Sequence, residues 1–471
     1  MLPDDVLLEI FDFYVGEEDE GDEDEDVLFK GGIEEWQTLV HVCWRWRSLV
    51  FGSPRRLNLR LVCTLETPAR DTLDAWPSLP LLVQCSGSLI AHPTEDVDNI
   101  IAVLEHSNRV VKIDLIKVDG SELENVLVAM QVPFPELTDL QLTSEDGMVS
   151  VRPDSFLGGS APRLQSLSLA GIPFPGLPKL LLSATHLVHL YLDNIPHSGY
   201  FSPEAMVAVL STLTSLDSLS LQFESPQSHP DRASRRPPPL TRSVLPALTS
   251  FQFKGVCEYL EDFVACIDAP PLNNVQITFF NQIVFDTPQF IQFIRRTSLK
   301  AFKNALVQFT DRTSRVHLAT LTPCFGTLDM EIPCVELDWQ VSSMEQVCTM
   351  CLPPLSTLED LLIYEDPRSQ PVWQESEPQD NIENALWLEL LQPFTHVKNL
   401  YLSEKFASRI IPALQELAEE RSTEVLPSLQ NIILEKPEFA AMRVTQQITS
   451  HPIAVSRWRT SLSDMITDKL F

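Results

Sequence analysis

The feature that most constrains the fold of this chain is a short apolar pattern that recurs over most of its length. The pattern is apolar-x-x-apolar-x-apolar, as in Leu164, Leu167 and Leu169. The last two apolar side chains lie on one face of a short strand because they are two residues apart, and the first anchors the start of that strand. One copy occurs by chance in any Leu-rich helix, whereas ten copies indicate a stack of similar strands. The copies begin at Val110, Leu137, Leu164, Leu187, Leu216, Leu248, Leu272, Leu358, Val397 and Leu429.

The spacing of these copies indicates a repeat protein. Successive starts among the first seven copies are 23 to 32 residues apart, which is around the period of leucine-rich repeats. Amphipathic stretches at 203–213 and 410–418 lie between copies and predict return helices. We therefore predict an α/β fold in which residues 98–436 form a curved leucine-rich-repeat solenoid, with parallel strands on its concave face and helices on its convex face. An irregular α/β domain, or two smaller domains, is the alternative.

Two polar, Pro-rich segments interrupt the pattern. Residues 225–243 and 365–381 are predicted to form loops that project from the solenoid. Residues 52–97 precede the first copies and are predicted to be a connector. Residues 437–471 follow the last copy and are predicted to be a C-terminal cap or tail.

The N-terminal segment has the pattern of two short amphipathic helices. Pro3 suits the first turn of a helix over residues 2–15, and Asp4 and Asp5 favour its positive end. A second helix is predicted from about Glu34 as far as Val50. Two helices of this length cannot bury their apolar faces alone, so they need each other and a further surface.

This segment, residues 1–51, resembles an F-box motif. The resemblance depends on a Leu-Pro start, an apolar helix that ends near Ile-Phe, and a later Val-Cys followed by Trp-Arg. The residues that carry it are Leu2, Pro3, Asp5, Leu8, Ile10, Phe11, Leu39, Val42, Cys43, Trp46 and Arg47. Together with the repeats, the motif makes the chain similar to fungal F-box proteins with C-terminal leucine-rich repeats.

The resemblance implies a function in protein ubiquitination. F-box helices dock into the Skp-type adaptor of a cullin–RING ubiquitin ligase, called an SCF ligase, and the repeats present a protein substrate. The chain would then be a non-catalytic substrate-recognition subunit, with the cullin and the RING subunit as indirect partners. For each contact residue, packing between the two helices is the alternative role. The residues expected to supply or support the adaptor contact are Leu2, Pro3, Leu7, Leu8, Ile10, Phe11, Val42, Cys43 and Trp46.

An acidic segment at 16–33 separates the two predicted helices. Residues 17–26 contain nine acidic residues in ten positions and contribute −9 to the net charge of −31. Such a block repels itself and stays solvated, so we predict a surface loop. An electrostatic contact with a basic partner is the alternative.

The overall charge and the cysteines limit the partners and the compartment. With 34 basic and 65 acidic residues, the chain would be repelled by phosphate backbones, which argues against nucleic acid as a partner. Neither a signal peptide nor an apolar run of about 18 residues is found, which argues against a membrane protein. The nine cysteines are scattered, so we expect a reducing compartment, the cytoplasm or the nucleus.

No group of residues indicates catalysis, a metal or a cofactor. Cys348 and Cys351 form a lone CxxC, and a structural zinc site needs four ligands, so buried thiols are expected. His186 and His189 are three residues apart, but they fall at the start of a predicted strand. The phosphate-binding and nucleophile motifs of common enzymes are absent from the sequence. We therefore expect a protein that is not an enzyme.

The predicted substrate surface is the concave face of the solenoid. Strand residues between the buried apolar positions project onto that face, and small polar side chains mixed with Tyr suit protein recognition. Ordinary solvated strand surface is the alternative for most of them. The candidates are Asp139, Gln141, Thr143, Ser166, Ser168, His189, Tyr191, Asp193, Ser218, Ser220, Gln222, Gln252, Lys254, Tyr364, Asn399 and Tyr401.

Two other functions stay open at this point. The chain could be a non-degradative interaction scaffold of the leucine-rich-repeat type, which binds the adaptor without promoting degradation. It could also be a repeat-only recognition protein in which residues 1–51 cap the solenoid. The sequence identifies no particular substrate.

Overall fold

The computed structural model describes most of the chain. The described residues are 2–15, 35–54, 56–65, 68–76, 78–86, 95–145, 155–174, 176–230, 241–281, 285–299, 302–320, 326–353, 355–365, 384–419 and 425–435. The predicted acidic loop at 16–33 and the predicted cap or tail at 437–471 lie outside these residues. Most of the two predicted projecting loops, at 231–240 and 366–381, also lies outside them.

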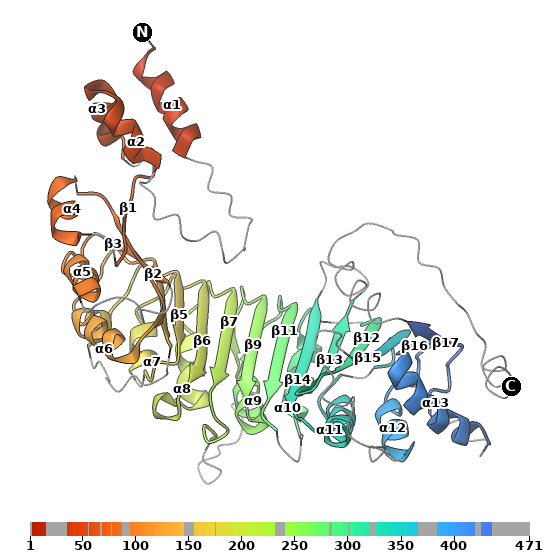
Figure 1. Ribbon diagram of the computed structural model, residues 1–471. Helices are drawn as coiled ribbons and strands as arrows, with labels where there is room; N and C mark the ends of the chain where they lie inside the picture. The colour runs from red at the N-terminus through yellow and green to blue at the C-terminus, as the bar shows by residue number, and fades with distance from the viewer. Residues whose placement is uncertain are drawn as a thin grey trace. The chain divides into compact units, whose positions relative to one another are not determined.

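The chain separates into two compact units, Met1–Leu187 and Val188–Phe471. Three short helices open the first unit (Figure 1). They are α1 (Asp4–Val15), α2 (Glu35–Val42) and α3 (Trp44–Gly52). Asp4 and Asp5 occupy the first turn of α1, where their charge complements the helix dipole.

The second N-terminal helix predicted from the sequence is in fact two helices, α2 and α3. Cys43 lies between them with an extended backbone, at φ −160° and ψ 168°. Its Sγ accepts a hydrogen bond from the backbone N–H of Trp46 at 3.5 Å, so Cys43 caps the start of α3. The prediction of one continuous helix is therefore wrong at this residue.

The rest of the first unit alternates strands with helices. Its strands are β1 (Leu61–Cys63), β2 (Leu81–Ser86), β3 (Val110–Val118), β4 (Asp139–Ser144) and β5 (Ser166–Ala170). Its helices are α4 (Ala69–Ala75), α5 (Glu95–Leu104), α6 (Gly120–Ala129) and α7 (Leu177–Leu181), with a 3-10 helix at Phe156–Gly159. The five strands pair in chain order, and every pair is parallel. The strands thus begin within 52–97, the segment predicted as a connector.

The recurring apolar pattern sets the register of these strands. Leu140 of β4 lies opposite Leu167 of β5, and Leu142 lies opposite Leu169. All four side chains are buried. Each such side chain contributes roughly 2 kcal/mol when it leaves water, so stacking equivalent residues of successive strands stabilises the array.

The second unit continues the alternation of strands and helices. Its strands are β6 (His189–Ile195), β7 (Ser218–Phe223), β8 (Ser243–Val244), β9 (Ser250–Gly255), β10 (Ile267–Asp268), β11 (Asn274–Phe279), β12 (Asn304–Phe309), β13 (Thr313–Ala319), β14 (Thr327–Pro333), β15 (Asp360–Glu365), β16 (Asn399–Ser403) and β17 (Asn431–Glu435). Its helices are α8 (Pro203–Leu210), α9 (Cys257–Val264), α10 (Pro288–Arg296), α11 (Leu337–Met350), α12 (Asn384–Leu391) and α13 (Glu404–Glu419), with a 3-10 helix at His197–Gly199. Helices α8 to α13 all lie along the lower side of the strands in Figure 1.

The strand order of the second unit departs from a plain repeat in its middle. The order is β6-β7-β9-β11-β14-β13-β12-β15-β16-β17, while β8 and β10 form a separate pair. Strand β13 is antiparallel to both β12 and β14, whereas all other neighbours within this unit's larger sheet are parallel. After β11 the chain forms β12 three positions further along the sheet. Strands β13 and β14 then fill the two positions between them, with β14 next to β11. The prediction of parallel strands alone is therefore wrong for this hairpin insert.

The parallel stacking of strands with the repeated pattern, joined by return helices, is that of leucine-rich repeats. The predicted α/β fold, a long and mostly parallel stack of repeated strands joined by helices, is thereby confirmed. Among the described residues, none of the helices has the length and apolar composition needed to cross a membrane.

Candidate functional site

The three N-terminal helices pack around a small aromatic core. The rings of Phe11 in α1 and Trp46 in α3 meet edge to face, with centroids 4.7 Å apart. Trp36 of α2 is buried and meets Trp76, which follows α4, at 5.3 Å. The indole Nε1 of Trp36 also donates a hydrogen bond to the backbone oxygen of Arg60 at 3.0 Å. The helices are thus packed both on each other and on the start of the repeats.

Arginine side chains link α1 to the segments that follow it. The guanidinium of Arg45 donates to Oδ1 of Asp4 and, at 2.6 Å, to the backbone oxygen of Leu2. Arg56 forms an ion pair with Glu9. These pairs are largely exposed, so each adds little to stability, but together they orient α1.

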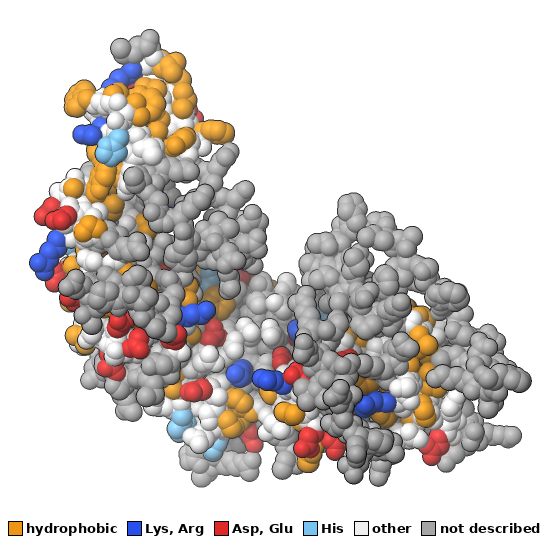
Figure 2. Space-filling model, viewed as in Figure 1, with side chains coloured by type: hydrophobic (Ala, Val, Ile, Leu, Met, Phe, Trp, Pro, Cys, Tyr) orange, Lys and Arg blue, Asp and Glu red, His pale blue; other side chains and the backbone are white. Residues whose placement is uncertain are grey.

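A set of apolar side chains stays outside this core, and we call it the apolar face. Phe13 is 74% exposed and Trp44 is 82% exposed. Along α1 its members recur at helical spacing and form one stripe. The apolar face consists of Leu2, Val6, Ile10, Phe13, Tyr14, Val42 and Trp44. Figure 2 shows hydrophobic side chains gathered over the N-terminal helices.

The structure divides the predicted adaptor residues into two groups. Leu2, Pro3, Ile10, Val42 and Cys43 are exposed and available for contact. The others are Trp46, which is half-buried, and Leu7, Leu8 and Phe11, which are buried. The buried side chains can only support the exposed ones.

Sequence reasoning missed three prominent members of the apolar face, Phe13, Tyr14 and Trp44. Helix α1 carries two apolar stripes, and the residues of both recur at intervals of three and four. A pattern of this kind does not tell which stripe faces inward. Trp44 is not among the residues that carry the motif, although a large aromatic side chain at the start of α3 is a signal of contact.

The second candidate surface is the face of the strands opposite their buried Leu side chains, which we call the open face. In the first unit, Asp139 lies opposite Ser166 and Gln141 lies opposite Ser168. These side chains and Thr143 are half-buried. The first unit therefore presents a strip of half-buried polar side chains here.

In the second unit one row of aligned residues runs across all ten strands of the larger sheet. Each member lies opposite the next in the strand pairing. The row is Tyr191, Ser220, Gln252, Gln276, Asp329, His317, Leu306, Leu362, Tyr401 and Ile433. Sequence reasoning identified only Tyr191, Ser220, Gln252 and Tyr401. It missed the residues of the hairpin insert because the repeat pattern does not extend over that insert.

The hairpin insert places a charged network in the middle of this row. Nε of Arg315 donates to Oδ1 of Asp329 at 2.6 Å, and Nη2 pairs with Oδ2. Nδ1 of His317 lies 3.4 Å from the same Oδ2. Burial alone would raise the pKa of Asp329, but hydrogen bonds from His317 and Arg315 outweigh burial and lower that pKa. Burial raises the pKa of the nearby Glu331 carboxyl, and the charge of Arg315 opposes this shift.

A second polar cluster lies toward β6. Oγ of Ser220 donates to Oδ1 of Asp193 at 2.9 Å, and Nε2 of Gln222 donates to Oγ of Ser220 at 3.2 Å. Burial raises the pKa of Asp193. The hydrogen bond from Ser220 and the positive charge of Lys254 oppose this shift but do not cancel it. Ser220 is buried, so its predicted contact with a substrate is replaced by this internal hydrogen bond.

On the other side of the charged network the row becomes apolar. Leu306 and Tyr364 form a buried cluster with Leu362 packed against it. Tyr364 and Tyr401 were predicted as exposed recognition residues, but both are buried. Tyr364 packs in this cluster, and Tyr401 lies opposite Leu362 in the strand pairing, so both residues are part of the packing of the sheet.

Three further predicted residues, His189, Ser218 and Asn399, lie in a polar row at the start of the strands, whereas Lys254 lies near the end of β9 opposite Gln222. Nδ2 of Asn399 donates to Oδ1 of Asp360 at 2.7 Å, and Nδ2 of Asn431 donates to Oδ1 of Asn399 at 2.7 Å. His189 lies opposite Ser218 in the pairing, and its ring stacks on that of Tyr191 at 6.2 Å. These contacts join the side chains of neighbouring strands.

The cysteines and histidines singled out from the sequence do not meet at a reactive site. Cys348 and Cys351 are buried at the end of α11, and burial raises the pKa of the Cys351 thiol to about 12. Thiolates are the metal-binding and nucleophilic form, so these thiols are inert at neutral pH. The described residues contain no group of three or more potential metal ligands.

No protein-family model and no curated protein matches the sequence. A solved structure of the leucine-rich repeat-containing protein LegL7 from Legionella pneumophila is similar over 84% of this chain and 99% of that chain, with 11% identity and a TM-score of 0.28. A TM-score this low carries no argument, so the repeat assignment depends on the strand order and register given above.

Proposed function

We propose that this chain is the substrate-recognition subunit of an SCF ubiquitin ligase. Its N-terminal helices would bind the Skp-type adaptor, and through it the cullin and the RING subunit. The observation that carries the proposal is the apolar face, which stays exposed although the three helices already have a packed core. Large aromatic side chains are the usual anchors of protein interfaces, and Phe13 and Trp44 are the most exposed members.

The repeats would bind the substrate through their open face. Arg315 and His317 of the charged network and the neighbouring Leu362 are partly exposed, a combination that suits a protein partner. The chain would act without catalytic residues, by holding a substrate near the ubiquitin-carrying enzyme. No nucleic acid or membrane is part of this proposal.

The proposed compartment is the cytoplasm or the nucleus. The nine cysteines are scattered along the sequence, a distribution that favours a reducing environment.

The experiment that tests the proposal is affinity capture from cells in which the ligase is blocked, followed by reconstitution. Trapped proteins are identified and incubated with the chain, the adaptor, cullin, RING subunit and ubiquitin. We expect ubiquitin to be transferred to the trapped protein, and we expect this transfer to require the apolar face. A variant with Ile10→Asp and Phe13→Asp should abolish transfer, whereas Val335→Asp with Trp339→Asp, two exposed apolar residues of the second unit, should not.

The alternative is a non-degradative interaction scaffold, which the repeat architecture supports by itself. Such a scaffold would capture the adaptor and a partner without ubiquitin transfer. The contact between Trp36 and Trp76 favours a further alternative, in which the N-terminal helices cap the repeats. Deletion of residues 1–51 would then lower the Tm of the remaining chain strongly, because Trp76 and Arg60, just before β1, lose their contacts with Trp36.

A further inference from the structure

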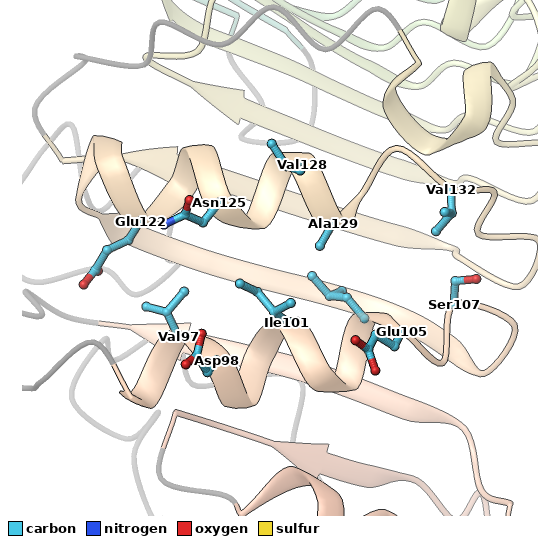
Figure 3. Close-up of a pocket in the computed structure, with 11 residues that line it drawn as sticks. Val97, Asp98, Ile101, Glu105, Ser107, Glu122, Asn125, Val128, Ala129 and Val132 are labelled. Atoms are coloured by element: carbon cyan, nitrogen blue, oxygen red, sulfur yellow. The ribbon is translucent and has the colours of Figure 1, made fainter.

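The first unit carries a groove that the proposed function does not use. It lies between α5 and α6, on the helical side of the repeats, and has a volume of about 820 Å³. Figure 3 shows the two helices side by side, with Val97, Ile101 and Ala129 turned toward the space between them. This volume falls in the range of about 300–1,000 Å³ typical of binding pockets and admits several large apolar side chains.

The floor of the groove is apolar and partly exposed. Val97, Ile101 and Leu104 line it from α5, and Val128 and Ala129 line it from α6. Val128 is 57% exposed, and Val132, just beyond α6, is 45% exposed. Apolar side chains at this exposure gain free energy when a partner covers them.

The rim of the groove is acidic. Asp98 and Glu122 lie toward one end of the apolar floor and Glu105 lies toward the other, as Figure 3 shows. None of the residues that line the groove is Lys or Arg. The charge complementary to this rim is therefore positive, and the net charge of −31 would also attract a cationic partner at long range.

The spacing of the acidic residues defines the shape of the partner. Asp98 and Glu105 are seven residues apart on α5 or directly after it, which corresponds to roughly 10 Å along the helix axis. A helix lying along the groove matches this spacing with two basic residues seven apart. Its residues three and four positions after the first basic residue then face the apolar floor.

We propose that the groove between α5 and α6 binds a cationic amphipathic helix of a partner protein, with basic residues at i and i+7 and apolar residues at i+3 and i+4. This site is separate from the apolar face and from the open face. It would allow a partner to bind the helical side of the first unit while the other surfaces stay accessible.

The test uses the full chain and a synthetic helical peptide of about 18 residues, long enough to hold a helix, with Leu and Arg at these positions. A second peptide carries Glu in place of Arg. We expect saturable binding of the Arg peptide alone, measured by fluorescence anisotropy. The variant Asp98→Asn with Glu105→Gln should weaken it roughly tenfold.

The matched control is Asp71→Asn with Asp74→Asn on α4, which removes the same charge from exposed positions of the same unit. This control should leave the affinity within about twofold. Val128→Asp should abolish binding, and because Val128 is exposed the chain should keep its Tm. Equal weakening by the two charge variants would show attraction to the overall negative charge and would overturn the proposal. Equal affinity of the Glu peptide and the Arg peptide would also overturn it, and so would unchanged affinity of the Val128→Asp variant.

Discussion

Arg315 and Asp329 form a two-point ion pair across adjacent antiparallel strands of the hairpin insert. Nε of Arg315 donates to Oδ1 at 2.6 Å, and Nη2 donates to Oδ2. The Asp329 side chain is only 8% exposed, whereas that of Arg315 is 41% exposed. Arg315 therefore neutralises a buried carboxylate at the centre of the open face. Removal of the Asp329 charge tests whether the hairpin insert depends on this ion pair.

Asp329→Asn should lower the free energy of unfolding by about 2 kcal/mol, below the 3–5 kcal/mol of fully buried pairs because Arg315 is partly solvated. Denaturant unfolding at neutral pH measures this. The lowered pKa of Asp329 also sets a pH dependence. Its stabilisation is complete above the ordinary Asp pKa and is lost as pH falls through the lowered folded value, so wild type and variant should converge only in strong acid.

The control for this variant is Asp311→Asn, because Asp311 pairs with an exposed Arg312. We expect a change below about 0.5 kcal/mol there. Equal losses in the two variants would mean that the buried pair has no special part in stability.

Glu331→Gln should have the opposite effect. Burial raises the pKa of Glu331, so the folded protein binds the proton more tightly than the unfolded chain. Above the raised pKa the ionised carboxylate therefore costs stability, and below the ordinary Glu pKa it costs none. We expect the variant to have a higher Tm than wild type at pH 7 and an equal Tm in acid, as measured by thermal scans across pH. A lower Tm at pH 7 would contradict this expectation.

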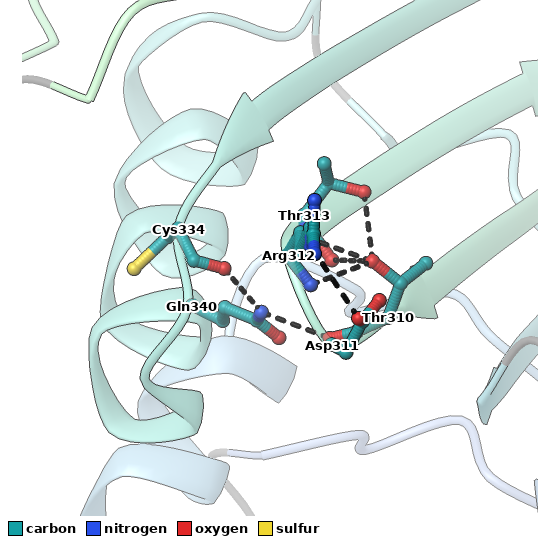
Figure 4. Close-up of polar contacts among 6 residues, drawn as sticks. All are labelled: Thr310, Asp311, Arg312, Thr313, Cys334 and Gln340. Atoms are coloured by element: carbon teal, nitrogen blue, oxygen red, sulfur yellow. Dashed lines mark hydrogen bonds and ion pairs between the residues drawn. The ribbon is translucent and has the colours of Figure 1, made fainter. Parts of the chain in front are cut away.

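Gln340 connects the hairpin insert to the helix that follows it. Its Nε2 donates to the backbone oxygen of Thr310 at 3.0 Å and to that of Cys334 at 2.6 Å (Figure 4). Gln340→Leu keeps a similar volume but leaves both oxygens without this donor. We expect a loss of about 1–3 kcal/mol in denaturant unfolding. The exposed neighbour Trp339 supplies the control, since Trp339→Gln should change stability by less than about 0.5 kcal/mol.

Phe11 and Ile10 are adjacent in α1 but face opposite environments. Phe11→Ala should destabilise the N-terminal helices by about 3 kcal/mol, because it leaves a cavity against Trp46. Ile10→Ala should change stability by less than about 0.5 kcal/mol, since Ile10 is exposed. Hydrogen exchange of α1 and α3 distinguishes the two. Similar exchange in both variants would mean that Phe11 is not part of the core described here.

The repeated part of the fold could be predicted from the sequence, because Leu140, Leu167 and their equivalents must stack if each strand buries one face. The hairpin insert could not be predicted. Its strands alternate apolar and polar residues, as in Val316, His317 and Leu318, and this period fits parallel and antiparallel pairing alike. The choice between them depends on non-local contacts that the spacing does not encode.

The candidate surfaces could be predicted only in part for a similar reason. The spacing of Leu7, Ile10 and Phe11 indicated a helix with apolar residues but did not tell which residues its neighbours cover. On the open face, Tyr364 and Tyr401 were expected to be exposed because they alternate with core residues. Their burial depends on Leu306 and Leu362 of adjacent strands, which the linear pattern does not bring together.

The most direct test of the proposed function is an equilibrium titration of the full chain with purified Skp-type adaptor. We expect saturable one-to-one binding that Ile10→Asp with Phe13→Asp abolishes while the Tm is kept, and that Val335→Asp with Trp339→Asp leaves unchanged. Absence of binding by the wild-type chain, or equal affinity of the folded Ile10 and Phe13 variant, would contradict the assignment of the apolar face as the adaptor site.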